Sequence, residues 1–184
     1  VIYRSECTVN LKKFLPGLIP FLLAFVLPLL LVYTWWGGFN PVLIEETAAG
    51  PYSYAYLESS GDYSKLPDKA VEAREVLVAA GIDVGKPITV LYSNPDLVDV
   101  GKRLARTGYL VQPGSKVPLP LAVDSIPSRS VLVARVRAGS MLAPGRAYAA
   151  LDKYLQARGE GIRMPTVEIY EIADSVMSMG QLTV

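Results

Sequence analysis

The feature that most constrains this chain is a long, uncharged, apolar run close to its N-terminus. No side chain between Lys13 and Glu45 is charged, and the 23 residues from Phe14 to Trp36 are mostly apolar. A helix needs about 20 such residues to cross the hydrocarbon core of a bilayer. The run therefore predicts a transmembrane helix over 14–36. A signal peptide is the alternative, but its apolar core is about 7–15 residues long, and no small-x-small cleavage pattern follows this run closely.

The charges that flank the run predict how the chain is oriented in the membrane. Three basic residues and one acidic residue precede it, whereas Glu45 and Glu46 follow it and no basic residue appears before Lys65. Cytoplasmic flanks carry the excess of Lys and Arg. We therefore expect a single-pass inner-membrane protein whose large domain lies in the periplasm. The expected parts are a short cytoplasmic N-terminus at 1–13, a transmembrane helix at 14–36, a linker at 37–45 and a folded domain at 46–184.

The remaining composition excludes several classes of site. The chain has no histidine, and its one cysteine is Cys7. Ser-His-Asp and Cys-His triads, a disulfide within one chain and a structural zinc site are therefore excluded. The formal net charge of +1 argues against a nucleic-acid binder. We expect no metal, no cofactor and no nucleic-acid partner.

Residues 46–184 alternate between strand and helix patterns. Pro67 opens the first expected helix and Gly81 follows it, as is usual for these residue types. A shift of 78 residues superposes Gly81 on Gly159 and Pro87 on Pro165 without a gap. This predicts an α+β fold of two tandem strand–helix–strand–strand units, with a cleft near their pseudo-twofold axis. The expected strands are 52–58, 88–92, 106–112, 130–137, 166–172 and 177–184, the expected helices are 67–80 and 144–158, and 123–128 is expected as a turn.

Three stretches of this domain resemble the GyrI-like small-molecule-binding family, which also forms the effector-binding part of AraC-type regulators. They are LYSNPDLVDVGKRLARTGYLV at 91–111, MPTVEIYEI at 164–172 and AGPYSYAYLESSGDYSKL at 49–66. The similarity covers 46–184. It implies a duplicated fold that binds small molecules, with Glu168 as the glutamate at the centre of the pocket. Ser93 stands where the family commonly has aspartate, so no role of that aspartate carries over.

The expected ligand site is built around Glu168. Alternation along strand 166–172 places Glu168 and Tyr170 on one face. The 78-residue shift places Tyr92 on the equivalent face of the first half, and Tyr54 and Tyr56 line one face of the first strand. A carboxylate among phenol rings suits a cationic, amphipathic ligand through charge pairing and cation–π contact. The alternative is a glutamate on a solvated strand, with tyrosines that only pack.

Two functions from different classes fit these patterns. The first is a membrane-anchored domain that binds a small cationic or amphipathic molecule or a peptide-like partner. The second is an accessory subunit of a larger integral-membrane complex, with a vestigial cleft. Pro16, Pro20 and Pro28 in the apolar run weakly favour packing against another membrane protein. The expected partners are thus the lipid bilayer, a small molecule and an integral-membrane complex.

An enzyme is the minor alternative. Some GyrI-like proteins hydrolyse small molecules with a pocket glutamate, and Glu168 is the residue that would act as a general base. The sequence shows no second carboxylate paired with it and no nucleophile, so we assign no catalytic residue.

Overall fold

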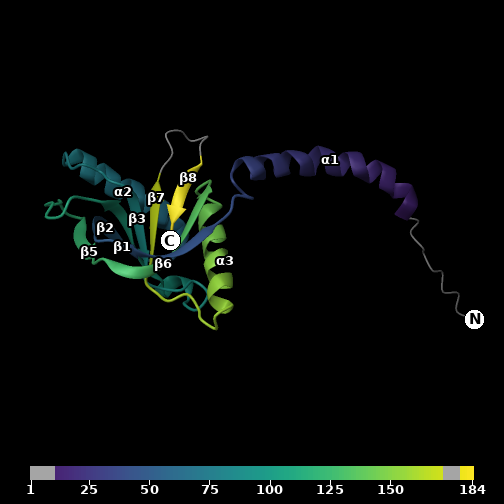
Figure 1. Cartoon of the computed structure of the whole chain (residues 1–184). Helices are drawn as coiled ribbons and strands as arrows, with labels where there is room; N and C mark the ends of the chain where they lie inside the picture. The colour runs from purple at the N-terminus through teal and green to yellow at the C-terminus, as the bar shows by residue number, and fades with distance from the viewer. Residues whose placement is uncertain (1–10, 172–178) are drawn as a thin grey trace, which may run out of the picture. The chain divides into compact units, whose positions relative to one another are not determined.

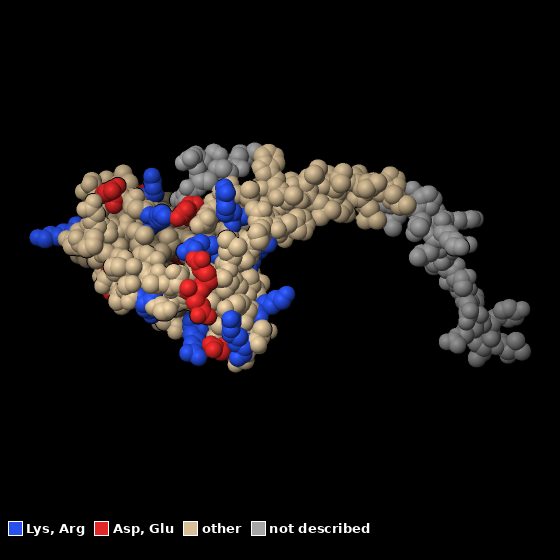
Figure 2. Space-filling model, in the orientation of Figure 1, with Lys and Arg blue, Asp and Glu red and all other residues tan. Residues whose placement is uncertain are grey.

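The computed structural model describes residues 11–171 and 179–184 (Figure 1). The chain divides into two units, Val1–Phe39 and Asn40–Val184. The first unit contains α1, a helix of 25 residues from Leu11 to Trp35. Its described apolar side chains are exposed, for example Phe25 at 61% and Leu29 at 70%. Figure 2 shows no charged side chain on the visible face of this described part.

None of the helices is both long and apolar enough to cross a membrane, over the residues whose placement the structure describes. The anchor at 14–36 and the orientation of the chain stay predictions. Cys7 and the charged residues at positions 4 and 6 lie outside the described residues.

The second unit is built on one sheet of eight antiparallel strands in the order β1-β6-β8-β7-β3-β4-β2-β5. Together with two helices, α2 at Leu66–Ala79 and α3 at Ala143–Gln156, the sheet confirms the α+β class. Two short 3-10 turns occur at Tyr63–Lys65 and Val100–Lys102. The strands are β1 (Leu43–Ala49), β2 (Tyr52–Ser60), β3 (Pro87–Leu91), β4 (Leu104–Leu110), β5 (Ala122–Ile126), β6 (Arg129–Ala138), β7 (Thr166–Glu171) and β8 (Gly180–Thr183).

The two helices begin and end by the same devices. Each has a proline in its first turn, Pro67 in α2 and Pro144 in α3, where the missing N–H has no helical partner to lose. Gly81 and Gly159 follow the two helices with φ of 68° and 72°. This left-handed backbone ends a helix, and glycine adopts it without strain. The helices therefore keep the sequence repeat that the 78-residue shift detects.

The order of the strands across the sheet is symmetric. Reading it from one edge or from the other gives the same order once each strand is replaced by its counterpart in the other half. β1 pairs with β6, and β5 pairs with β2, so each half lends its first strand to the other half. β3 and β7 meet at the centre. Each half is thus strand–strand–helix–strand–strand. The sequence analysis missed β1, which begins within the expected linker, and β5, which overlaps the expected turn.

Both missed strands are edge strands, which explains why their patterns are weak. β5 is exposed at four of its five positions, and β1 has no fully buried residue. Without a buried face, neither strand needs the alternation of apolar and polar residues that identifies a half-buried strand. The expected last strand, 177–184, is β8, and its first two positions lie outside the described residues.

The pairing of the two central strands, β3 and β7, shows that the 78-residue shift is off by one residue in this part of the chain. Thr89 lies opposite Glu168, and Val90 lies opposite Val167. Side chains of directly opposite residues share a face of the sheet, and a slip of one residue moves a side chain to the other face. The residue that shares the face of Glu168 is therefore Thr89 and not Val90.

Both helices cover the face that carries Thr89 and Glu168. α2 packs on β2 and β4, and α3 packs on β6 and β8, each over its own cluster of buried apolar side chains. A third cluster, with Tyr54 and Ile88, lies on the opposite face of the central strands. A fourth, with Leu66 and Leu91, lies on the helical face where the two halves meet. This junction positions the candidate site.

Candidate ligand-binding site

Glu168 lies in β7 at the centre of the sheet, and its side chain is nearly closed off from solvent, with 7% exposed. The Tyr170 hydroxyl donates a hydrogen bond of 3.0 Å to Glu168 Oε2. Tyr148 comes from α3, and its hydroxyl lies 2.8 Å from Thr166 Oγ1. The structure thus brings together two of the predicted site residues, Glu168 and Tyr170, and adds Tyr148 and Thr166.

The covering of this carboxylate follows from the meeting of the two halves. Leu66 at the start of α2 and Leu91 at the end of β3 form a small buried cluster, against which Tyr63, Tyr148 and Met164 pack. Tyr63 is held in place because its hydroxyl donates to the backbone oxygens of Ser93 and Leu104. Ser93 therefore contributes a backbone oxygen here, and its hydroxyl accepts from the Leu104 N–H.

Burial sets the protonation of the cluster. It raises the pKa of the Glu168 carboxyl, while hydrogen bonds from Tyr148 and Tyr170 act in the opposite direction. Burial also raises the pKa of the Tyr148 and Tyr170 phenols, and the nearby carboxylate raises both further. Within 11–171 and 179–184, no Lys or Arg forms an ion pair with Glu168. The site therefore holds a buried carboxyl group whose partners are phenols alone.

The other three predicted site residues lie on the opposite face of the sheet. Tyr56 is opposite Gly108, and Gly108 is opposite Ile88, which in turn is opposite Ile169. Tyr56 therefore shares the face of Ile169, the neighbour of Glu168 whose side chain points away from the helices. The prediction that all five residues line one cleft is corrected: Tyr54, Tyr56 and Tyr92 belong to another cluster.

That second cluster is organised by Arg106. The guanidinium lies 4.5 Å from the centre of the Tyr56 ring and 5.1 Å from that of Tyr92. It donates to Asp124 at 2.7 Å and to the Tyr92 hydroxyl at 3.0 Å. Tyr54 is buried beside it, which raises the pKa of its phenol. These tyrosines already have a cation, so a cationic ligand gains nothing from them.

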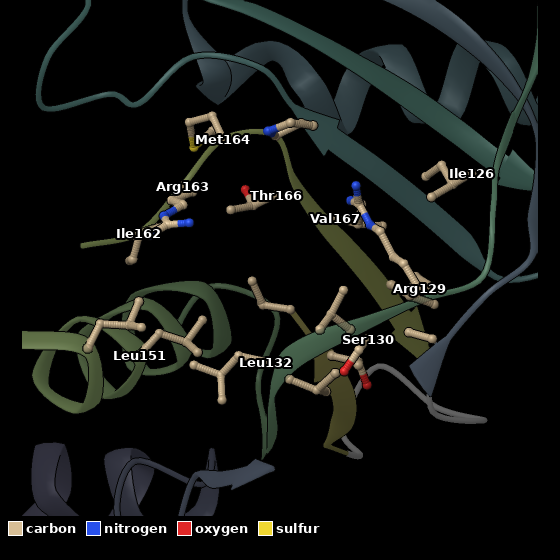
Figure 3. A pocket seen from close by; sticks show the side chains of 18 of the residues that line it. Ile126, Arg129, Ser130, Leu132, Leu151, Ile162, Arg163, Met164, Thr166 and Val167 are labelled. Carbon is tan, nitrogen blue, oxygen red and sulfur yellow. The ribbon is translucent and has the colours of Figure 1, made fainter. Parts of the chain in front are cut away.

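A cavity of about 660 Å³ opens between β6 and the start of β7. Leu132, Leu151 and Ile162 give it an apolar wall, and Arg129 and Thr166 add polar groups (Figure 3). It lies beside the end of β8, and Thr183 and Val184 also line it.

Thr166 connects the cavity with the buried carboxyl group. Its side chain lines the cavity, and its hydroxyl is bonded to Tyr148, which also bonds Glu168. Glu168 itself stands behind this pair and does not line the cavity. Over the described ranges, no group of three or more acidic, thiol or imidazole side chains is arranged to hold a metal ion.

Sequence reasoning missed Tyr148 and Tyr63 as members of the site, and it did not assign Thr166 to the site. Thr166 is on the same face as Glu168 by alternation, so its pattern was visible. Tyr148 and Tyr63 come from another helix and another turn, and only the packing of the two halves places them beside β7. No local pattern in the sequence marks such a contact.

Comparisons with known proteins identify the fold and little beyond it. No family model matches the chain, and no curated protein matches it. Among solved structures, the C-terminal domain of EcmrR aligns with a TM-score of 0.59 and 13% identity, covering 77% of this chain and 95% of that one. An EcmrR–DNA complex aligns with a TM-score of 0.60 and 12% identity, covering 95% of this chain and 68% of that one.

An uncharacterised protein from Listeria innocua is a third structural match. It aligns with a TM-score of 0.53 and 13% identity, covering 76% of this chain and 90% of that one. These likenesses are consistent with the GyrI-like fold that the sequence resemblance implies. At such identities they show the fold alone.

Proposed function

We propose that residues 46–184 form a domain that binds a small cationic, amphipathic molecule at the junction of the cavity and the Glu168 cluster. The observation that carries this proposal is a buried carboxyl group without a cation. A buried charge costs free energy unless it is paired. Glu168 has phenol partners and no basic partner among the described residues. A cationic ligand therefore supplies the positive charge that pairs with this carboxylate.

The surrounding groups favour the same class of ligand. The apolar wall of the cavity suits the hydrophobic part of an amphipathic molecule, and the phenol rings of Tyr148 and Tyr170 suit its cationic head. The ligand reaches Glu168 past Thr166, which lines the cavity and whose hydroxyl is bonded to Tyr148.

We also propose that residues 14–36 anchor this domain to the inner membrane, with the domain in the periplasm. The uncharged run and the exposure of apolar side chains along α1 support it. The test is a Lys116→Cys chain on a Cys7→Ser background, because Lys116 is exposed. A membrane-impermeant maleimide should label it in outer-permeabilised cells. Labelling only after the inner membrane is lysed would overturn the proposed orientation.

The ligand proposal is tested with a pair of probes that differ in charge and not in shape. Benzyltrimethylammonium and its uncharged isostere neopentylbenzene are titrated into the full chain. We expect the cation to bind at least tenfold more tightly than the isostere. Glu168→Gln should remove that preference. Glu171→Gln, which removes an exposed carboxylate of the same strand, should leave it unchanged. Equal affinity of both probes for the wild-type chain would refute the proposal.

The accessory-subunit alternative predicts a different result. With a vestigial cleft, neither probe binds, and a partner stays with the chain when it is extracted in mild detergent.

A further inference from the structure

The outer face of α2 carries an inference that goes beyond the proposed function, because no residue of this helix lines the cavity or bonds Glu168. α2 packs on β2 and β4 through a face that buries Ala73 and Leu77. Ala73 lies about 200° around the helix from Val71, so Val71 points away from the sheet. Val71 and Val78 are 56% and 54% exposed. The outer face of α2 thus presents two valines to solvent.

The other helix of the domain has no such pair at the equivalent positions. The 78-residue shift, which fits the two helices, places Val71 on Ala149 and Val78 on Gln156, and both are exposed. Small or polar residues of this kind are typical of the solvated face of a helix. The exposed valines are therefore a property of α2 and do not come from the repeat.

The two valines form a stripe with one charged residue on each side. Val78 lies seven residues after Val71, which is close to two full turns, so the two side chains are nearly in line along the helix. At about 100° per residue, Arg74 lies about 50° to one side of this line and Glu75 about 50° to the other. Both are exposed, and neither is in an ion pair within the part of the chain that the structure describes. We call these four residues the valine stripe.

We propose that the valine stripe binds the valine stripe of a second copy of this chain, with the two α2 helices parallel. A twofold axis parallel to both helices packs each valine against the same valine of the other copy. It also places Arg74 of each copy beside Glu75 of the other, which makes two ion pairs in each dimer.

The positions of the charges select this orientation. In an antiparallel pair, the twofold axis is perpendicular to the helices, and each flank of the stripe meets the same flank of the other copy. Arg74 would then lie opposite Arg74, and Glu75 opposite Glu75, and like charges at such distances repel. Only the parallel pair is complementary both in apolar contact and in charge.

The size of the contact sets the expected strength. One face of a 14-residue helix buries less than the roughly 1,600 Å² of a standard stable interface. We therefore expect a reversible dimer with a dissociation constant on the order of 10–100 μM.

The test is a charge exchange, measured by sedimentation equilibrium of the full chain in a nonionic detergent. Arg74→Glu should raise the dissociation constant about tenfold, because it replaces two attractive pairs by two repulsive ones. Glu75→Arg should do the same. The two changes together restore opposite charges, so the double variant should return to within about twofold of the wild-type constant. Lys153→Glu, at the position of α3 equivalent to Glu75, is the control and should have no effect.

Cross-linking tests the orientation of the two helices. Val71→Cys on a Cys7→Ser background places two thiols side by side only in the parallel pair, so mild oxidation should join two chains by a disulfide. Ala149→Cys, at the equivalent position of α3, should not be joined. A chain that stays monomeric at about 1 mM would overturn the proposal. So would a dimer that does not respond to the charge exchange, which is the result expected of association through α1.

Discussion

Thr89 and Glu168 lie opposite each other across the strand pair at the centre of the sheet, so the duplication places a hydroxyl in one half and a carboxyl group in the other. Thr89 is satisfied within its own half, because its Oγ1 lies 3.0 Å from Thr107 Oγ1. Glu168 instead depends on phenols from β7 and α3. The two halves share a fold, and only the second has a buried ionisable group at the axis.

The first prediction concerns the stability of the empty protein. Glu168→Gln keeps the shape of the side chain, replaces one acceptor oxygen by an amide donor and removes the charge. We expect it to raise the free energy of unfolding at pH 7 by on the order of 1 kcal/mol. Denaturant titration of both chains measures the change. A loss of several kcal/mol would show that Glu168 is part of a structural ion pair, contrary to this account.

The pH dependence of the same comparison gives a second prediction. Burial raises the pKa of Glu168 in the folded state above its value of about 4.3 in an unfolded chain. The folded state thus binds the proton more tightly than the unfolded state does. The contribution of Glu168 to the free energy of unfolding is therefore fully present below the pKa of the unfolded state. It is lost as pH rises through the folded pKa. The stability of the wild-type chain relative to Glu168→Gln should fall over that window and be constant at lower pH. An unchanged difference from pH 3 to pH 8 would contradict the buried state of the carboxyl group.

Tyr148 is the subject of a third prediction. Tyr148→Phe removes a hydroxyl that bonds Thr166 and Glu168, and we expect a loss of about 1 kcal/mol in unfolding free energy. It also removes a hydrogen bond that lowers the pKa of Glu168, so the pH window of the previous comparison should move upward. Tyr154→Phe is the matched control on the same helix, because the Tyr154 ring packs against Arg158 and Tyr154 is not among the groups that shift the pKa of Glu168. Equal effects of the two changes would show that Tyr148 has no special role.

A fourth prediction compares two glycines. A Cβ on Gly108 would overlap the backbone oxygen of Ala55, whereas a Cβ on Gly145 meets nothing within 4 Å. Gly108→Ala should therefore destabilise the sheet by more than about 3 kcal/mol. Gly145→Ala lies in α3 and should stabilise the domain by about 0.5–1 kcal/mol. Thermal unfolding measures both. A mild effect at Gly108 would mean that β2 and β4 approach less closely than the register requires.

The sequence predicted the parts of the fold that carry strong local signals. The helices were found because proline and glycine mark their ends, and the inner strands because their apolar residues are regular. β1 and β5 were missed because edge strands with exposed side chains need no such regularity. The exchange of these strands between halves has no local signal at all.

The candidate site was predicted in part for the same reason. Glu168 and Tyr170 were joined correctly because alternation along one strand is a local rule. Tyr92 was assigned to the same face by the 78-residue shift. That shift fits at Gly81 but is off by one residue at Thr89, and an error of one residue places the Tyr92 side chain on the wrong face of the sheet. Tyr148 was missed because its place beside β7 depends on how α3 packs. Relations between elements decide the site, and a single sequence does not display them.

The most direct test of the central claim is the pH dependence of cation binding. If benzyltrimethylammonium pairs with Glu168, its binding requires the ionised carboxylate and releases the proton that burial retains. The affinity of the wild-type chain should then rise with pH through the folded-state pKa of Glu168 and reach a plateau above it, with a proton released to buffer in calorimetry. Glu168→Gln should show weak binding that does not change with pH. An affinity of the wild-type chain that is independent of pH, or the same rise in Glu168→Gln, would contradict the assignment of Glu168 as the ligand's counter-charge.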